Sequence, residues 1–178
     1  IFADARSPET QTVLNLKIKF RESFRPFAPV VLSEKAQEWF ELKTESPYML
    51  LVDAVHHSQL RPSRQTNDVL FEKLKTQRST IPAVTHVDNS ARIQTAHKET
   101  NPLLHALLTE FEKQTGVPCL ANTSFNVRGE PIVESPTDAF RCFMGTDLDA
   151  LAIGPYWLEK SEQKPELRQK YHESFSLD

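Results

Sequence analysis

The chain has 178 residues, a formal net charge of −3, 39% hydrophobic residues and 25% charged residues, a composition typical of one folded, soluble domain. A net negative chain has no overall attraction to nucleic acid or to anionic membranes, so neither is an expected partner. No apolar run approaches the ~18 residues that a membrane-spanning helix needs, and no signal peptide is visible. Cys119 and Cys142 lie in apolar stretches without metal-ligand spacing, which favours a reducing cytoplasm as the compartment.

The first candidate site is a row of cations near the N-terminus. Polar and apolar residues alternate over 13–21, which predicts a strand with Lys17, Lys19 and Arg21 on one face. Arg25 follows between apolar and proline residues, a setting that predicts partial burial. Two interpretations are open. The row protects an edge strand from aggregation, or it binds a polyphosphate or acyl phosphate, whose oxygens Arg and Lys recognise.

The next elements follow from hydrophobic periodicity and turn residues. We expect a short helix at 33–42, a buried strand at 47–55, a polar surface excursion at 56–80, and strands at 83–87 and 91–96. The clearest helix is 101–116, with Asn101 as its N-cap, Pro102 in its first turn and Gly116 at its end. Its apolar stripe at 103–111 is expected in the core.

The second half of the chain continues the mixture of strands and helices. A short strand at 117–121 is followed by a polar loop, a helix at 135–145 with a capping box of Ser135 and Asp138, and a buried strand at 148–154. From about residue 159 the sequence is charged and poor in apolar residues. This order predicts an α/β or α+β domain whose mixed sheet is flanked by helices.

The second candidate site is the polar loop after the strand at 117–121. Asn122, Thr123, Ser124 and Asn126 are small hydrogen-bonding residues, and Arg128-Gly129 follows them. Open α/β sheets bind ligands at strand ends, so this loop is a candidate for nucleotide binding. It lacks the Gly-rich spacing and the Lys-Ser/Thr pair of a phosphate-binding loop of the Walker type. The alternative is a turn whose polar side chains satisfy their own backbone.

The third candidate site is the stretch THVDNSARIQT at 85–95. His86 and Asp88 share a strand face, but no third ligand is obvious, so no metal site is predicted and a hydrogen-bonded pair shaping the turn is favoured. Arg92 is a candidate for a further anion contact. His56 and His57 have no partner spacing and receive no role.

Four stretches of this sequence resemble a known family. They are LNLKIKFRESFRPFAPVVL, IPAVTHVDNSARIQT, the long stretch from NPLLHALLTEF to GEPIVESPTDAF, and LDALAIG. Together they resemble the C-terminal region of O-carbamoyltransferases of the nodulation-protein NodU and cephalosporin CmcH type. The resemblance implies a YrdC-like twisted mixed sheet over residues 1–158 and a charged peripheral tail at 159–178. It also implies a preceding actin-like transferase domain that this chain lacks, so the chain is expected to be a fragment.

The resemblance also implies the reaction. Such a domain is expected to use ATP and carbamoyl phosphate to make carbamoyl-adenylate and pyrophosphate, after which the preceding domain moves the carbamoyl group to an acceptor hydroxyl. Mg²⁺ is expected to be carried by the phosphates, because no carboxylate cluster offers a cage, and iron is expected only in the missing N-terminal domain. The expected partners are ATP, carbamoyl phosphate and that missing domain.

The resemblance assigns roles to seven residues. Lys19 and Arg21 resemble the lysine-arginine motif of YrdC-like domains, and Ser124 and Asn126 resemble their serine-asparagine motif. The expected catalytic residues are Lys19, Arg25 and Arg92, and the expected nucleotide-binding residues are Arg21, Asn122, Ser124 and Asn126. One departure from the family is Asn89-Ser90, where the family usually has Gly-Thr, and losing the glycine is expected to stiffen this turn.

Two alternative functions stay open at this point. One is a non-catalytic YrdC-like module that binds nucleotide or RNA, and the negative net charge argues against sustained RNA binding. The other is synthesis of threonylcarbamoyl-adenylate. The RESFRPFAP and GEPIV stretches favour the O-carbamoyltransferase branch over this alternative.

Overall fold

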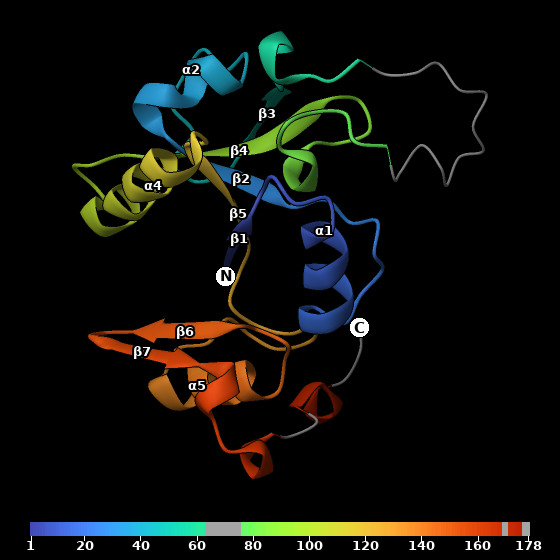
Figure 1. The fold of residues 1–178 in the computed structure, drawn as a ribbon, viewed down its shortest axis with the longest axis vertical. Helices are drawn as coiled ribbons and strands as arrows, with labels where there is room; N and C mark the ends of the chain where they lie inside the picture. Colours follow the sequence, from blue (N-terminus) through green and yellow to red (C-terminus); the bar gives the residue numbers. More distant parts are fainter. Residues whose placement is uncertain (63–75, 169–170, 176–178) are drawn as a thin grey trace. The chain divides into compact units, whose positions relative to one another are not determined.

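The structure is a computed structural model that describes residues 1–62, 76–168 and 171–175 (Figure 1). Much of the expected excursion at 56–80 therefore lies outside the described residues. The chain divides into two compact units, one formed by Ile1–Gln11 and Pro26–Thr123, the other by Thr12–Arg25 and Ser124–Asp178. Among the described helices, none has the length and apolar character needed to cross a membrane.

The first unit is built on a five-stranded mixed sheet. Its strands are β1 (Phe2–Asp4), β2 (Ala28–Leu32), β3 (Leu51–Ala54), β4 (Ser90–Ala96) and β5 (Cys119–Asn122). They lie in the order β1-β5-β2-β4-β3. β2 runs parallel to β4, while β1, β3 and β5 pair antiparallel with their neighbours. This mixed sheet with flanking helices confirms the α/β class (Figure 1).

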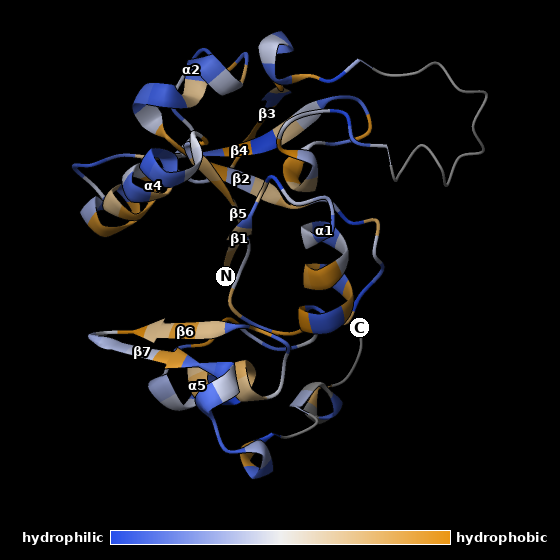
Figure 2. Cartoon of the chain, in the orientation of Figure 1, coloured by the Kyte–Doolittle hydropathy of each residue, from blue (hydrophilic) through white to orange (hydrophobic). Residues whose placement is uncertain are grey.

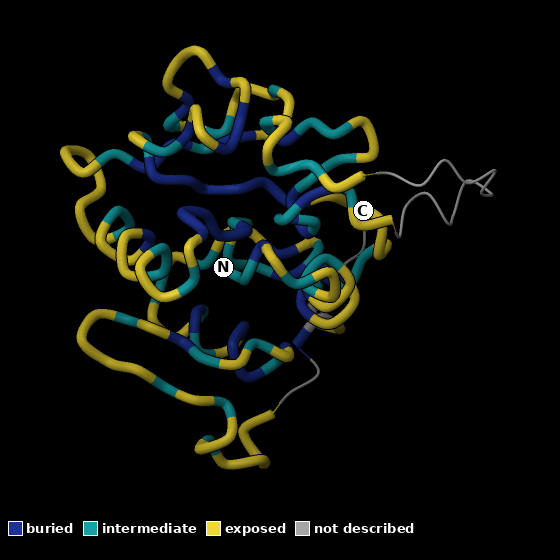
Figure 3. The backbone as a smooth tube through the Cα atoms, turned by 45° about the horizontal axis from the view of Figure 1, so that its top comes forward, coloured by how far each residue is buried: buried dark blue, intermediate teal, exposed yellow. Residues whose placement is uncertain are grey.

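The core of this unit lies on the central strand and the helix α4 (Pro102–Thr115). All five residues of β2 are buried, and the hydropathy and burial patterns of the sheet are visible in Figures 2 and 3. Leu108 of α4 packs with Val30 and Leu120. Asn101 caps the helix and Gly116 ends it in the left-handed conformation, as expected. Leu103 is 84% exposed, so only part of the apolar stripe reaches the core.

Three sequence expectations for this unit need correction. The segment 33–42 forms a 3-10 turn and a single α-helical turn, α2 (Ala36–Trp39), while β3 is shorter than the expected strand at 47–55. β3 is also not buried: it is the edge strand of the described sheet, next to β4, and Val52 is 58% exposed. The expected strand at 83–87 is wrong, because Pro82–Val84 forms a 3-10 helix that a proline can begin.

The second unit begins with another correction. The expected strand at 13–21 is wrong: α1 (Thr10–Val13) continues into a π-helix at Leu14–Ile18. Leu14 and Ile18 are buried and four residues apart, which is helical spacing. The alternation of Lys17, Lys19 and Arg21 therefore does not indicate a strand here. The π-helix ends at Ile18 with Lys19 as its C-cap, and Phe20, the next residue, has a positive φ of 48°.

The rest of the second unit packs α5 (Pro136–Met144) against the hairpin of β6 (Ala150–Ile153) and β7 (Tyr156–Glu159). Ser135 and Asp138 form the expected capping box, and Phe143 and Leu151 share a buried cluster. Tyr171 is also buried and packs with Val127 and Cys142. The charged composition after residue 159 did not indicate this contact.

Candidate anion-binding site

Lys19 is the centre of the site in the second unit. It follows the π-helix directly, and its backbone N–H donates to the carbonyl of Leu14 at 2.8 Å, five residues back. The side chain is buried, with 4% of the residue exposed. A buried ammonium needs hydrogen-bond acceptors to compensate for the water it has lost.

Ser124 and Asn126 supply those acceptors. Lys19 Nζ donates to the Ser124 carbonyl at 2.5 Å and to the Asn126 carbonyl at 2.9 Å. It also contacts Ser124 Oγ at 3.1 Å and Asn126 Oδ1 at 2.7 Å. An ammonium has only three N–H donors, so at least one of these four contacts is shared. The lysine motif and the serine-asparagine motif, 105 residues apart in sequence, thus meet at one ammonium group.

The charge on Lys19 is weakened by its surroundings. Burial, and to a smaller extent the neighbouring guanidinium of Arg21, lower the pKa of this ammonium to about 8. Both causes disfavour the cation, because desolvation and a like charge each raise its free energy. Lys19 therefore titrates close to neutral pH, and an anionic ligand would stabilise its protonated form.

Arg21 and the backbone after it are held by Asn15, a fully buried residue of the π-helix. Arg21 Nε donates to Asn15 Oδ1 at 2.7 Å, and Asn15 Nδ2 donates to the carbonyls of Ser23 at 3.1 Å and Arg25 at 2.8 Å. A buried amide that uses both its oxygen and its nitrogen fixes the local chain path. Asn15 therefore sets the loop that carries Arg21 and Arg25.

Arg25 lies at the exposed end of this loop. Its side chain retains 49% of its accessible area, and its Nε contacts Glu22 Oε2 at 2.9 Å. The side chain is thus about half-buried, in line with the predicted partial burial. An exposed ion pair of this kind contributes little to stability, so the guanidinium can exchange the carboxylate for another anion at low cost.

A tight turn at 127–130 forms the opposite wall. The N–H of Glu130 donates to the carbonyl of Val127 at 3.3 Å, and Gly129, the third residue of the turn, has a φ of 79°. This position of a type II turn requires a positive φ, which glycine adopts without strain. The buried Glu130 accepts from the Val127 N–H at 2.8 Å and from the Tyr171 hydroxyl.

These segments enclose a cleft of about 360 Å³. Its lining residues are Lys19, Arg21, Arg25, Ser124, Asn126, Val127, Arg128, Gly129, Glu130 and Pro131. Four of them carry cationic side chains and one, Glu130, carries a carboxylate whose two oxygens already accept hydrogen bonds. The cleft is therefore suited to an anion with several oxygens.

Arg92 and Asn122, the other two expected site residues, belong to the first unit. Arg92 is exposed on β4 opposite Val52, and Asn122 ends β5. Asn122 Nδ2 donates to Gln94 Oε1 at 2.7 Å, and Gln94 shares the β4 face of Arg92 because side chains two residues apart point the same way. The two residues thus lie on one face of the sheet, whereas the other five line the cleft of the second unit.

The turn before β4 differs from the expected His86–Asp88 pair. Ser90 Oγ links the two side chains, with His86 Nδ1 at 2.9 Å and Asp88 Oδ1 at 2.7 Å. Burial lowers the pKa of His86, and the hydrogen bonds from Ser90 lower that of Asp88. Asn89 has a φ of 65°, and asparagine tolerates this left-handed conformation better than most residues. The replacement of the family's glycine is therefore compatible with the turn.

Sequence reasoning missed Asn15, Arg128 and Glu130. Arg128 stood beside a recognised motif, and its place before a turn glycine was the available signal. Asn15 and Glu130 had no such signal, because a polar residue in an apolar helix or in a polar loop does not report burial. Their partners only become evident when segments distant in sequence are brought together.

Comparison with known proteins agrees with these features. A family described as "Carbamoyltransferase C-terminus" matches residues 1–160. The chain is 41% identical to nodulation protein NolNO of Sinorhizobium fredii over 93% of this chain and 22% of that protein. It is 33% identical to 3'-hydroxymethylcephem-O-carbamoyltransferase of Amycolatopsis lactamdurans over 91% of this chain and 27% of that protein.

A third relative, an uncharacterized protein of Synechocystis, is 54% identical over 100% of this chain and 29% of its own length. The chain thus spans less than a third of the length of these three relatives. The family matches almost the whole chain, including both segments that form the Lys19 cleft. The chain therefore belongs to the carbamoyltransferase family and corresponds to its C-terminal region.

Proposed function

We propose that this chain is the activating module of an O-carbamoyltransferase. It would bind ATP and carbamoyl phosphate, form carbamoyl-adenylate, and supply this intermediate for transfer to an acceptor hydroxyl. The observation that carries the proposal is the convergence of Lys19 with Ser124 and Asn126 in a cleft lined by Arg21, Arg25 and Arg128. A relative named as an O-carbamoyltransferase supports the acceptor class.

The proposed reaction has two steps. Water first displaces phosphate from carbamoyl phosphate and leaves carbamate. An oxygen of carbamate then attacks the α-phosphorus of ATP, the bond from that phosphorus to the bridging oxygen breaks, and pyrophosphate leaves. Negative charge grows on the phosphate oxygens and on the leaving group, so correctly placed cations lower the barrier without a nucleophilic side chain.

The cleft residues divide into two groups by their contacts. Arg25 has a half-exposed side chain and Arg128 stands on the turn, so these two are the proposed contacts to the outer phosphates. Lys19 lies deeper and already holds Ser124 and Asn126. We assign it to the phosphate at which charge develops, while Arg21, Ser124 and Asn126 hold the nucleotide.

Mg²⁺ would reach this cleft bound to the phosphates. The only carboxylate among the described lining residues is Glu130, and its two oxygens accept from Tyr171 and Val127. Mg²⁺ needs near-octahedral oxygen ligation and usually keeps waters and substrate phosphates. Arg92 and Asn122 are proposed as further anion and nucleotide contacts of the first unit.

The proposal is tested by exchange between ATP and labelled pyrophosphate in the presence of carbamoyl phosphate. The native chain is expected to catalyse exchange, and Arg25→Ala or Arg128→Ala to reduce it by about tenfold, the loss of one charge-assisted phosphate contact. Lys17→Ala is the matched control, since Lys17 is exposed and its Nζ pairs with Asp147 at 3.8 Å. Calorimetric titration with ATP separates binding from turnover.

The proposed function fails if ATP does not bind, or if Arg25→Ala and Arg128→Ala behave like the native chain. Exchange that requires threonine and bicarbonate in place of carbamoyl phosphate would assign the chain to threonylcarbamoyl-adenylate synthesis instead.

A further inference from the structure

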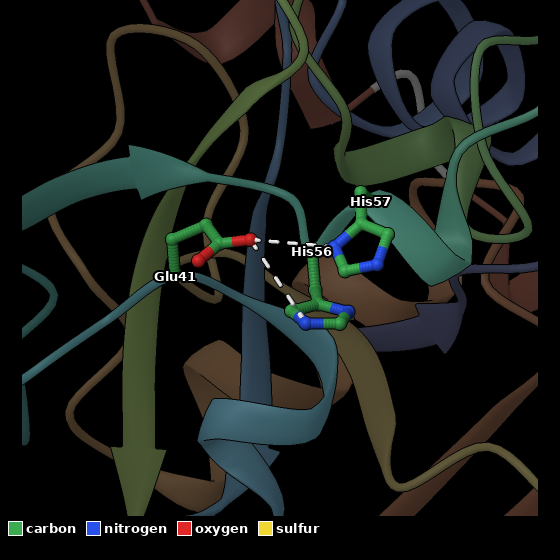
Figure 4. A group of neighbouring side chains, drawn as sticks. All are labelled: Glu41, His56 and His57. Atoms are coloured by element: carbon green, nitrogen blue, oxygen red, sulfur yellow. Dashed lines mark ion pairs between the residues drawn. The ribbon is translucent and has the colours of Figure 1, made fainter.

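A second cluster of side chains lies on the first unit, and it has the opposite ligand preference from the basic cleft. Glu41, His56 and His57 each direct one ligand atom toward a common point (Figure 4). Glu41 Oε1 lies 4.0 Å from His56 Nε2 and 3.9 Å from His57 Nδ1. All three atoms lie within 4.8 Å of one another. We propose that this cluster is a binding site for a divalent transition-metal ion, with zinc as the ion it fits best.

The backbone brings Glu41 and His56 together. Phe40 and Val55 form an isolated antiparallel bridge and are both buried. On either side of that bridge, Glu41 N–H donates to the Ala54 carbonyl at 2.9 Å and His56 N–H donates to the Trp39 carbonyl at 2.8 Å. Residues next to a bridged pair point to the opposite face, so Glu41 and His56 emerge on the same outer face, on either side of the bridge and two positions apart along the ladder.

His57 reaches the same point because the chain turns immediately after His56. His57–Gln59 forms a 3-10 helix, in which the Gln59 N–H donates to the His56 carbonyl at 2.9 Å. This turn brings the two imidazole rings together, with centroids 4.2 Å apart and planes tilted by 40°. Two consecutive histidines would point apart on a regular strand. The end of the strand is therefore what makes the pair convergent.

Ser58 orients the ring of His56. His56 Nδ1 lies 2.7 Å from Ser58 Oγ, while its Nε2 faces Glu41 (Figure 4). A histidine that binds a metal through one ring nitrogen normally places the other against a hydrogen-bond partner, which fixes its tautomer. On metal binding Nδ1 would carry the proton and donate it to Ser58 Oγ, in place of accepting the 3.3 Å bond from the Ser58 N–H.

The chemistry of the three ligands selects the ion. Imidazole nitrogens suit zinc, copper and nickel, whereas magnesium and calcium prefer all-oxygen sites. In a tetrahedral zinc site with bonds of about 2.0–2.1 Å, ligand atoms lie about 3.3–3.4 Å apart. The distances from Glu41 Oε1 to His56 Nε2 and His57 Nδ1 are 4.0 and 3.9 Å, and small side-chain rotations would shorten them to this value. Three protein ligands leave a fourth position for water or another ligand.

The site is tested by titrating the tag-free chain with zinc chloride in a calorimeter. The native chain is expected to bind one zinc ion, Glu41→Gln and His57→Ala each to bind at least tenfold more weakly, and excess Mg²⁺ not to compete. His105→Ala is the matched control, because His105 Nε2 contacts Glu34 Oε1 at 2.8 Å in another imidazole–carboxylate pair. Glu41 and His57 are exposed, with the His57 side chain 83% exposed, so folding is not at risk in either variant.

X-ray absorption at the zinc edge supplies an independent measurement. The site predicts a shell of nitrogen and oxygen at about 2.0–2.1 Å with imidazole scattering and no sulfur. A sulfur shell would place the ion at Cys119 or Cys142 and overturn the proposal. So would equal zinc affinity in the native chain and both ligand variants. ATP–pyrophosphate exchange does not enter either result, so the metal site stands or falls separately from the proposed function.

Discussion

The basic cleft and the Glu41–His56–His57 cluster are two ways of building a charged site on one chain. In the cleft, Lys19 meets Ser124 and Asn126 across 105 and 107 residues, and its ammonium is buried and fully hydrogen-bonded. The cluster joins residues within 16 positions of one another, and its ionic contacts are no shorter than 3.9 Å. The cleft is therefore preorganised before an anion arrives, whereas the cluster becomes tight only around an ion.

This difference has an energetic consequence. Removing the acceptors of a buried ammonium, or the ammonium itself, leaves buried polar groups without partners. This lowers the free energy of unfolding. Exposed side chains such as Glu41 and His57, whose ionic contacts are long, contribute little to stability, so removing them costs almost no folding free energy. Substitutions in the cleft should thus change both stability and anion binding, while substitutions in the cluster should change metal binding alone.

The largest effect is expected for Lys19→Met, which keeps most of the side-chain length and removes the ammonium. Ser124 and Asn126 would lose the donor that joins them, and the free energy of unfolding should fall by about 3 kcal/mol. ATP affinity should fall by about tenfold in the same variant. Urea denaturation measures the first quantity and calorimetry the second. Lys17→Met, at an exposed position, should change the unfolding free energy by less than about 0.5 kcal/mol.

Asn15→Ala is expected to have the next largest effect, although Asn15 does not line the cleft. It removes the hydrogen bonds to Arg21 Nε and to the Ser23 and Arg25 carbonyls, and should destabilise the chain by about 2 kcal/mol. ATP affinity should also fall, because Arg21 and Arg25 lose their fixed positions. Asn15→Asp keeps an acceptor for Arg21 and separates the two effects. Unchanged ATP affinity in a folded Asn15→Ala variant would contradict the positioning role.

Ser58→Ala tests whether a change in the proposed zinc site alters metal binding without altering stability. It removes the hydroxyl that contacts His56 Nδ1, and zinc affinity should fall by about tenfold, the usual scale for a residue that orients a metal-binding histidine. The midpoint of urea denaturation should not move, because Ser58 is exposed. Ser33→Ala, at a serine hydroxyl that contacts Glu34, serves as the control. Zinc calorimetry and urea denaturation together decide the outcome.

The pH dependence of ATP binding should separate Lys19 from the arginines of the cleft. The pKa of Lys19 is lowered to about 8, so roughly nine tenths of the Lys19 side chains are neutral amines at about pH 9. ATP affinity should therefore fall by up to about tenfold from about pH 7 to about pH 9. Arginine stays charged throughout this range. Binding measured across the range in Lys19→Met should lack the inflection near pH 8.

The same pKa shift predicts the opposite trend for stability. The folded pKa of about 8 lies below the ordinary lysine value of 10.5, so the unfolded chain binds more protons between these values and the Lys19 contribution to stability rises with pH. Lys160 has a pKa lowered to about 8 as well, chiefly by burial. The contribution of Lys19 is therefore obtained as the difference between the native chain and Lys19→Met at each pH.

The smallest effect is expected for Tyr171→Phe. It removes the hydroxyl that donates to Glu130 and keeps the hydrogen bond from the Val127 N–H to that carboxylate. One lost hydrogen bond should lower the free energy of unfolding by about 1 kcal/mol, measured by urea denaturation. Zinc affinity should stay the same, because Tyr171 belongs to the second unit. A change in zinc affinity would show that the two sites are not independent.

The sequence by itself determined the local structure wherever caps and periodicity agree. Asn101 and Gly116 bound α4, and Ser135 with Asp138 begins α5, because these residues satisfy helix ends with their own side chains or backbone. It also determined which motifs belong together, since family resemblance associates Lys19 and Arg21 with Ser124 and Asn126, and the structure brings Lys19 to Ser124 and Asn126.

Tertiary structure alone decided the rest. Alternation at 13–21 predicted a strand, but burial of Leu14, Asn15 and Ile18 on one helical side overrode it. Asn15 and Glu130 acquired their roles from partners that only folding supplies. His56 and His57 converge with Glu41 because a backbone bridge pairs two segments and a 3-10 turn follows. Spacing along a chain reports contacts within one helix or strand, whereas a site made from several segments depends on how the backbone pairs them.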